Sequence, residues 1–191
     1  MTKEEIESCR DMAELYLDKA DTDTNVVAKL QEIGFFDAPA SKRHHLAVPC
    51  GLLIHSVNVT EWLLKLTQAG LVSWEKESSP YRIGMFHDLV KCVCYMVDPL
   101  CAEGELLRYV YKQSGYVGHG AASAMIAMSV LGVRLTPVET ACICHHMGAF
   151  GLSDGQLREL DAALDYYPAE IIATHTADML ASRFSEAYRL D

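Results

Sequence analysis

Apolar residues at helical spacing, in one segment after another, constrain the fold more than any other feature of this sequence. The spacing runs through residues 3–19 and 25–34, and in the segment 51–70 it places Leu52 and Val59 two turns apart on one helix face. Alternation of the kind that builds strands is nearly absent. The sequence therefore predicts an all-α fold, a compact bundle of about seven to nine helices.

Signals for helix ends support this interpretation in the second half of the chain. Thr136 and Pro137, followed by Glu139, form an N-cap, a proline in the first helical position and a capping acid, and the helix that they open is expected to end at "HHMG". Ser153 and Asp154 could cap the next predicted helix, "GQLRELDAALDYY". Pro168 then opens a long amphipathic last helix, "AEIIATHTADMLASRFSEAYRL".

Length and composition fit one globular domain that covers residues 1–191. Half of the residues are hydrophobic and 22% are charged, which is ordinary for a domain that buries a large core. We expect residues 1–24 to form an N-terminal helix that packs on the rest of this domain.

Charge and hydropathy restrict the partners. The formal net charge is -10 and the longest run of basic residues is "KR" at 42–43, which argues against stable binding of duplex nucleic acid. The N-terminus lacks an apolar leader, and no segment reaches the ~18 apolar residues of a membrane span. We therefore expect a cytoplasmic protein without a membrane partner, and the oligomeric state is left open.

The seven cysteines are interpreted as thiols. Their number is odd and no C-x-x-C pair occurs, which is unlike a disulfide framework or a zinc finger. Two C-x-C pairs, Cys92 with Cys94 and Cys142 with Cys144, lie near histidines. We interpret them as small buried residues of helices rather than as zinc ligands.

The segment "GMFHDLVK", residues 84–91, places His87 and Asp88 side by side in an otherwise apolar run. Such polar side chains are costly to bury unless they are paired or bind a metal ion. Adjacent residues on a helix point about 100° apart, so both cannot approach one ion from a single helix face. Either the metal lies between helices or Asp88 bridges two ions.

Six of the eight histidines fall on predicted helices or at their ends. His55 and Asp178, like the His87–Asp88 pair, are flanked by core-forming residues. A single histidine on an apolar face is more often a core residue than a ligand. Imidazoles and carboxylates that converge from several helices of a bundle are, however, how such folds build divalent-metal sites.

The order His55, then His87–Asp88, then Asp178 resembles the H…HD…D signature of the HD-domain superfamily, all-helical metal-dependent phosphohydrolases. Four further segments look like sequence motifs of bacterial and phage members of this superfamily: "APASKRHHLAVPCGLLIHSVNV", "GHGAASAMI", "CHHMGAFG" and "HTADMLASR". The resemblance covers roughly residues 30–185. "HHMGAFG" is not followed by the GYP motif of the related cyclic-dinucleotide phosphodiesterases, which argues against cyclic di-GMP as the substrate.

The resemblance implies a binuclear metal site with Asp88 as the bridge. The first metal would be held by His55, His87, Asp88 and Asp178, and a second would add His119 and His146. One or two divalent transition metals are implied, Fe, Mn, Ni, Co or Zn. His119 could instead be only a capping or surface residue, because it lies between two glycines at a predicted helix start.

Several neighbouring residues have two interpretations. Lys91 could meet a substrate phosphate beside His87 and Asp88 or be a solvated lysine, and His175 could orient a ligand or be simply buried. The role of His145 is open, and Arg183 is expected at the surface. The small residues of "GHGAAS" could let an anion approach a helix N-terminus or serve helix packing. The loop residues Lys42, Arg43, His44 and His45 could line the site's entrance or be solvated.

The predicted function is hydrolysis of a phosphoester by a metal-activated water. The substrate would be a small phosphorylated molecule: a nucleotide, cyclic nucleotide or short oligonucleotide. His87, Asp88 and Lys91 are the expected catalytic residues. The alternative is an HD-fold mixed-valent di-iron oxygenase that acts on a small polyol or phosphonate. A regulatory module and a closed structural metal site agree less well with the ligand set.

Overall fold

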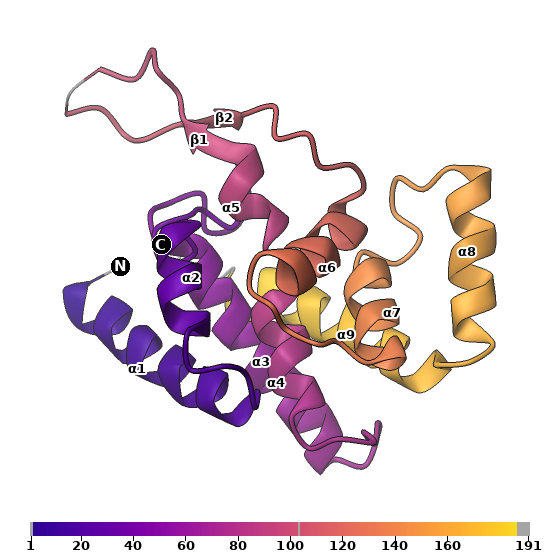
Figure 1. The fold of residues 1–191 in the computed structure, drawn as a ribbon. Coiled ribbons are helices and arrows are strands. Elements are labelled where there is room, and N and C mark those ends of the chain that lie inside the picture. Colours follow the sequence, from indigo (N-terminus) through magenta and orange to yellow (C-terminus); the bar gives the residue numbers. More distant parts are fainter. Residues whose placement is uncertain (1, 103, 187–191) are drawn as a thin grey trace.

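Helices form most of the structure, a computed structural model that describes residues 2–102 and 104–186 (Figure 1). The helices are α1 (Lys3–Lys19), α2 (Val26–Glu32), α3 (Gly51–Gln68), α4 (Ser79–Phe86), α5 (Val90–Cys94), α6 (His119–Ser129), α7 (Pro137–His145), α8 (Asp154–Leu164) and α9 (Pro168–Leu180), and a π-helical turn follows at Ala181–Ser185. The prediction of a mostly helical fold is thus confirmed. No helix in this described part of the chain is long and apolar enough to cross a membrane.

Helix α3 is the central element of the bundle. Helices α1, α4 and α9 pack against it, and α6 and α7 pack against each other beside α4 (Figure 1). Every residue from Gly51 to Thr60 is buried, because α3 is covered on all sides along its first half. Polar residues in that half must therefore find partners inside the protein.

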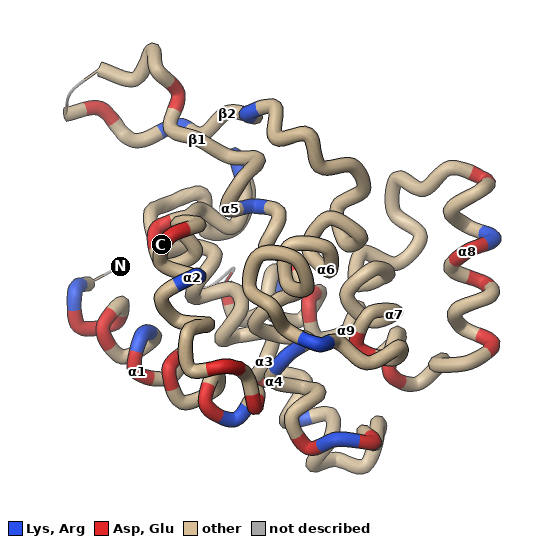
Figure 2. The backbone as a smooth tube through the Cα atoms, viewed as in Figure 1, with Lys and Arg blue, Asp and Glu red and all other residues tan. Residues whose placement is uncertain are grey.

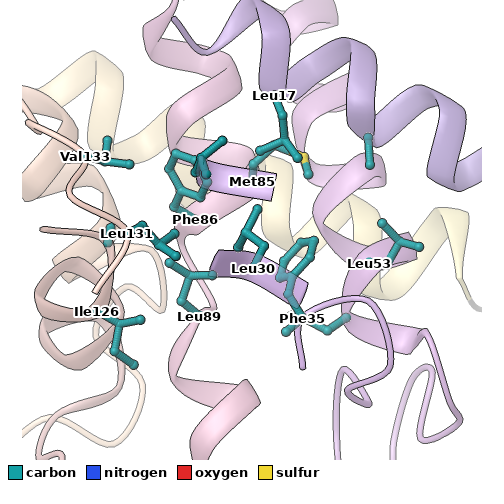
Figure 3. Close-up of a cluster of buried hydrophobic side chains, with 14 of the residues drawn as sticks. Leu17, Leu30, Phe35, Leu53, Met85, Phe86, Leu89, Ile126, Leu131 and Val133 are labelled. Atoms are coloured by element: carbon teal, nitrogen blue, oxygen red, sulfur yellow. The ribbon is translucent and has the colours of Figure 1, made fainter. Parts of the chain in front are cut away.

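The largest cluster of buried apolar side chains joins the N-terminal helices to α4, α6 and the chain after α6 (Figure 3). Leu30, Phe35, Phe86 and Leu89 are all inaccessible to solvent. Phe86 and Leu89 flank the His87–Asp88 pair on both sides. Burial of such side chains contributes about 1.5–3 kcal/mol each, so the core also anchors this pair.

The predicted helix starts are confirmed by complete capping boxes. The Thr136 hydroxyl accepts a hydrogen bond from the Glu139 amide at 3.3 Å, and the Glu139 carboxylate accepts one from the Thr136 amide at 2.8 Å. Ser153 and Gln156 form the same arrangement at the start of α8. Each cap satisfies amide groups that have no partner within the helix.

Three features differ from the expectation. The "GMFHDLVK" run is not one helix: α4 ends at Phe86 and α5 begins at Val90, so His87 and Asp88 lie in the turn between them. A short antiparallel hairpin, β1 (Tyr95–Val97) and β2 (Tyr109–Tyr111), follows α5, with Tyr95 opposite Tyr111. Strands of three residues are too short to show alternation. Helix α9 gives way to the π-helical turn, and residues 187–190 of the predicted last helix lie outside the described residues.

Candidate metal centre

The six predicted ligands meet at one place, around the carboxylate of Asp88, although they come from three helices and two turns. They are His55 on α3, His87 and Asp88 after α4, His119 at the start of α6, His146 directly after α7, and Asp178 on α9. His55, His87 and His146 are fully buried and Asp88 is 2% exposed. The structure therefore brings together the whole set that the sequence singled out.

Two glycines allow the helices to approach closely enough for this. A Cβ atom at Gly84 would collide with Thr60, so α4 packs directly on α3 and carries His87 toward His55. A Cβ atom at Gly120 would collide with the Ile143 and Cys144 carbonyl oxygens, so α6 packs directly on the end of α7. The small residues of "GHGAAS" thus serve helix packing.

The Oδ2 oxygen of Asp88 faces one pair of histidines. It lies 3.4 Å from Nε2 of His55 and 3.3 Å from Nε2 of His87, and these two nitrogens are 3.3 Å apart. Oδ1 of Asp178 lies 3.2 Å from the same nitrogen of His55. Two imidazole nitrogens and two carboxylates therefore surround one point.

The Oδ1 oxygen of Asp88 faces a second pair. It lies 2.6 Å from Nε2 of His119 and 3.4 Å from Nε2 of His146. Two candidate ligand groups, His55–His87–Asp88 and Asp88–His119–His146, hence share one carboxylate, and within each the ligand atoms lie within 4.8 Å of one another. A carboxylate with one oxygen in each group has the placement of a bridge.

The hydrogen bonds of the Nδ1 atoms show that the Nε2 atoms of the rings are available to bind a metal. Nδ1 of His87 lies 2.9 Å from the Gly84 carbonyl oxygen, and Nδ1 of His146 lies 2.8 Å from that of Ile143. A carbonyl oxygen only accepts, so both Nδ1 atoms carry the proton and donate it. In the neutral rings Nε2 then holds a lone pair directed toward Asp88, which is the arrangement of metal-binding histidines.

His55 is held in the same way by a carboxylate. Its Nδ1 donates to Oε1 of Glu186 at 2.9 Å, and Asn58 donates to the same oxygen at 3.1 Å. The Nε2 lone pairs of neutral His55 and His87 then face each other, which is repulsive unless a cation or a proton lies between them. Nε2 of His146 is buried, lies 3.4 Å from Oδ1 of Asp88 and has no hydrogen-bond partner within the described residues. These unsatisfied nitrogens fit a bound metal ion.

The charges of the cluster also favour a cation. The cluster contains three carboxylates, those of Asp88, Asp178 and Glu186. The ammonium group of Lys91 is the positive charge that contacts them in these ion pairs. Burial opposes ionisation of Asp88, but Lys91, His87 and His119 outweigh it and hold its pKa well below the usual range. One or two divalent ions would offset the remaining negative charge.

The pKa values of the histidines diverge with their surroundings. Burial lowers the pKa of His87, and the carboxylate of Asp88 offsets only part of this effect. For His55 burial acts in the same direction, but Glu186, Asp178 and Asp88 outweigh it and raise the pKa well above its usual value. Without metal, a proton on His55 therefore takes the place of a cation between the two rings.

Lys91 is not a solvated lysine. Its side chain is 9% exposed, and its Nζ lies 2.5 Å from Oδ2 of Asp88. It reaches the carboxylate from the first turn of α5, which begins beside Asp88 because the chain turns there. Lys91 thus fixes the carboxylate and places a positive charge at the edge of the centre.

Sequence reasoning missed Glu186, and it left His45 open between the entrance of the site and a solvated loop. Glu186 is 1% exposed and lies 131 positions beyond His55 in the chain. His45 packs its ring on His55 at 5.1 Å between centroids and lies 3.9 Å from Oε2 of Glu186. Burial lowers the pKa of His45 to about 4, with His55 adding to the effect. The loop before α3 therefore covers the centre, whereas Arg43 and His44 are exposed.

The other singled-out residues lie around the centre rather than in it. His175 donates from Nδ1 to the carbonyl oxygen of His146 at 2.8 Å, so it orients the backbone of a ligand. Arg183 is exposed, as expected. His145 is half-buried, and no hydrogen bond or ion pair of the described residues joins it to Asp88. Within these residues no cysteine belongs to a candidate ligand group, and burial raises the pKa of Cys142 to about 12.

The chain was compared with protein-family models, with curated proteins and with solved structures, and none of the three comparisons found a match.

Proposed function

We propose that this chain is an HD-domain phosphohydrolase with a binuclear metal centre. One observation carries the proposal: each carboxylate oxygen of Asp88 faces a different pair of histidines. The chain order of the ligands, which resembles the HD-domain signature, supports the same assignment.

The donor set suits a first-row divalent metal. Four imidazole nitrogens and the carboxylates of Asp88 and Asp178 fit Fe, Mn, Ni, Co or Zn better than Mg or Ca. Such ions would supply Lewis acidity, which lowers the pKa of water toward neutrality and stabilises charge on a phosphoester. In hydrolysis a water oxygen bonds to phosphorus, the ester P–O bond breaks and the leaving oxygen takes up a proton.

The protein's own residues prepare the site for this reaction. Asp88 holds the two ligand groups at a fixed separation, and Lys91 keeps its carboxylate ionised. Glu186 and the Gly84 and Ile143 carbonyl groups hold three rings with Nε2 directed inward. His119 is the most accessible of the four ligand histidines, with 29% of its side chain exposed, which supports approach of the substrate from its side of the centre.

Metal analysis of His119→Ala tests the binuclear assignment. We expect about two metal equivalents in the wild type purified without added metal and about one in the variant, because the Oδ1 side would lose its most accessible ligand. His145→Ala is the matched control, since the neighbouring His146 holds the ligand position. Equal metal content in wild type and His119→Ala would overturn the second site.

Activity on a chromogenic phosphodiester tests the reaction class. The metal-loaded wild type should release the chromophore, and removal of the metal with a chelator should abolish release. Failure to hydrolyse phosphomonoesters and phosphodiesters, together with consumption of O₂ by an iron-loaded sample, would replace hydrolysis by the di-iron oxygenase alternative.

A further inference from the structure

A cavity of about 390 Å³ opens beside His119, between α5 and the chain that leads from β2 to α6. Val90 and Cys94 form one wall, and residues 111–119 form the other. Because Nε2 of His119 lies 2.6 Å from Asp88, a molecule in this cavity would be one side chain away from the bridging carboxylate. A larger cavity of about 680 Å³ contains none of the metal-centre residues, and its Arg82 and Asp21 pair with each other.

The cavity wall differs in charge from the rest of the chain. No Asp or Glu occurs from Leu106 to Val138, although the protein has 26 acidic residues and a net charge of -10. Figure 2 shows a basic segment at the end of β2 and no acidic segment along the loop from there to α6. A wall without carboxylates is compatible with an anion that would be repelled elsewhere on the surface.

One lysine, Lys112, lines the cavity and a second, Lys42, lies against the ring of its Tyr111, and no ion pair within the described residues offsets either charge. The Lys112 amide donates to the Cys94 carbonyl oxygen at 2.8 Å, which fixes this residue at the cavity while its side chain stays exposed. Lys42 lies with Nζ 4.1 Å from the centre of the Tyr111 ring. Within the described residues neither ammonium group forms an ion pair, unlike that of Lys91. Lys112 and Lys42 are therefore available to a phosphate.

The wall also offers aromatic surface. Tyr111 is 62% exposed and its ring is braced by Tyr95 at 5.3 Å between centroids, whereas Tyr116 is half-buried and packs on the core. Gly115 and Gly118, with φ of +78° and +77°, curve the loop around the cavity. Aromatic side chains beside a cationic rim suit a ligand that combines a phosphate with a planar ring.

We propose that this cavity is the substrate-recognition site, and that it binds a phosphate-bearing ligand of single-nucleotide size. Lys112, with Lys42 beside it, pairs with the phosphate, and Tyr111 contacts the ring. The volume lies in the range of small-molecule sites, about 300–1,000 Å³, and is too small for a duplex or a protein segment. That the bound molecule is then hydrolysed rests on the proposed function, whereas its binding does not.

Titration calorimetry with a non-hydrolysable probe tests the proposal. The probe is the methylenephosphonate analogue of AMP, in which a carbon replaces the ester oxygen, and it is added to metal-loaded protein. We expect Lys112→Ala to weaken binding about tenfold, the effect of losing one charge-assisted hydrogen bond. Lys3→Ala, which removes an exposed lysine at the start of α1, is the matched control and should bind like the wild type.

A second variant separates the two parts of the ligand. Tyr111→Ala should weaken binding of the AMP analogue but leave binding of inorganic phosphate unchanged. Metal content should equal that of the wild type in both variants, because neither residue belongs to the centre. No binding of the analogue by the wild type, or equal affinity in wild type and Lys112→Ala, would overturn the recognition site.

The outcomes keep the two proposals apart. Hydrolysis of a phosphoester with no dependence on Lys112 would contradict the recognition site alone. Binding of the analogue that depends on Lys112, in a protein that hydrolyses no phosphoester, would uphold the recognition site and contradict the proposed reaction.

Discussion

Two clusters of buried charged residues in the described part of the chain differ in how completely their polar groups are satisfied. In the first, Arg82 donates to the carbonyl oxygens of Ala20 at 2.5 Å and Asp21 at 2.6 Å, and it lies 3.6 Å from the Glu139 carboxylate. Glu139 also accepts hydrogen bonds from Ser79 and Thr136, both at 2.8 Å. The buried positive and negative charges thus satisfy each other, and the exposed carboxylate of Asp21 also lies 3.7 Å from Arg82.

The cluster around Asp88 is left unbalanced. It has three carboxylates beside one ammonium group, imidazole nitrogens that face each other at 3.3 Å, and a buried nitrogen of His146 without a hydrogen bond in the described part of the chain. A protein gains nothing in stability from such an arrangement by itself, because unpaired buried groups are costly. A satisfied buried ion pair is thus structural, whereas a buried cluster whose nitrogen lone pairs have no protein partner has the properties of a metal site.

The largest expected effect is that of Asp88→Ala. The variant should lose all bound metal and lose phosphoester hydrolysis more than about 1,000-fold, because both ligand groups depend on this carboxylate. Helicity by circular dichroism should fall only modestly. Asp161→Ala, on the exposed face of α8, is the control and should keep its metal. Full metal content in Asp88→Ala would refute the bridge.

Loss of a carboxylate from the Arg82–Glu139 cluster should lower the stability of the protein and leave metal binding intact. Glu139→Gln keeps the size of the side chain but removes the buried counter-charge of Arg82, which is left with the exposed carboxylate of Asp21 at 3.7 Å. We expect the free energy of unfolding in urea to fall by about 3–5 kcal/mol, with the metal content of the folded protein unchanged. Glu14→Gln, at an exposed position on α1, should change it by less than about 0.5 kcal/mol. Loss of metal from folded Glu139→Gln would remove the distinction between the clusters.

The sequence predicted the helices and the ligands of the centre for different reasons. Helix starts such as Thr136 and Ser153 depend on residues three positions away, so local rules suffice. The ligands stood out because histidine and aspartate are costly in apolar runs. The common location of His55, His87, Asp88, His119, His146 and Asp178 was expected through the family resemblance, and the structure places them together.

What the sequence did not predict depends on distant contacts. The turn after Phe86 and the hairpin of β1 and β2 have no long periodic pattern. Glu186 looked like one more charge of an amphipathic helix, although it is buried against His55. One signal could have found it: residues eight positions apart lie on roughly the same helix face, and Asp178 precedes Glu186 by that interval. Only the packing of α9 and the following turn on α3 shows that the face is buried.

The smallest expected effect is a pH dependence that belongs to the Asp88 cluster. Although burial opposes protonation, carboxylates raise the pKa of His55 well above 6.5 and Asp88 raises that of His146. Above pH 6.5 the unfolded chain loses these protons while the folded, metal-free protein keeps them. Stability is therefore fully present below about pH 6.5 and falls as the pH rises through the folded pKa values, by at most about 1.4 kcal/mol per pH unit and group.

Urea unfolding in a chelator at pH 6.5, 7.5 and 8.5 measures this slope. Glu186→Gln should flatten it, because the carboxylate that contributes most to raising the pKa of His55 is lost. Glu139→Gln should lower the stability without changing the slope, which would separate the two clusters by a second criterion. Bound Zn²⁺ requires neutral imidazoles, so the stabilisation that it adds should grow with pH over the same range. A slope that is the same in wild type and Glu186→Gln would show that the proton between His55 and His87 is not held by this carboxylate.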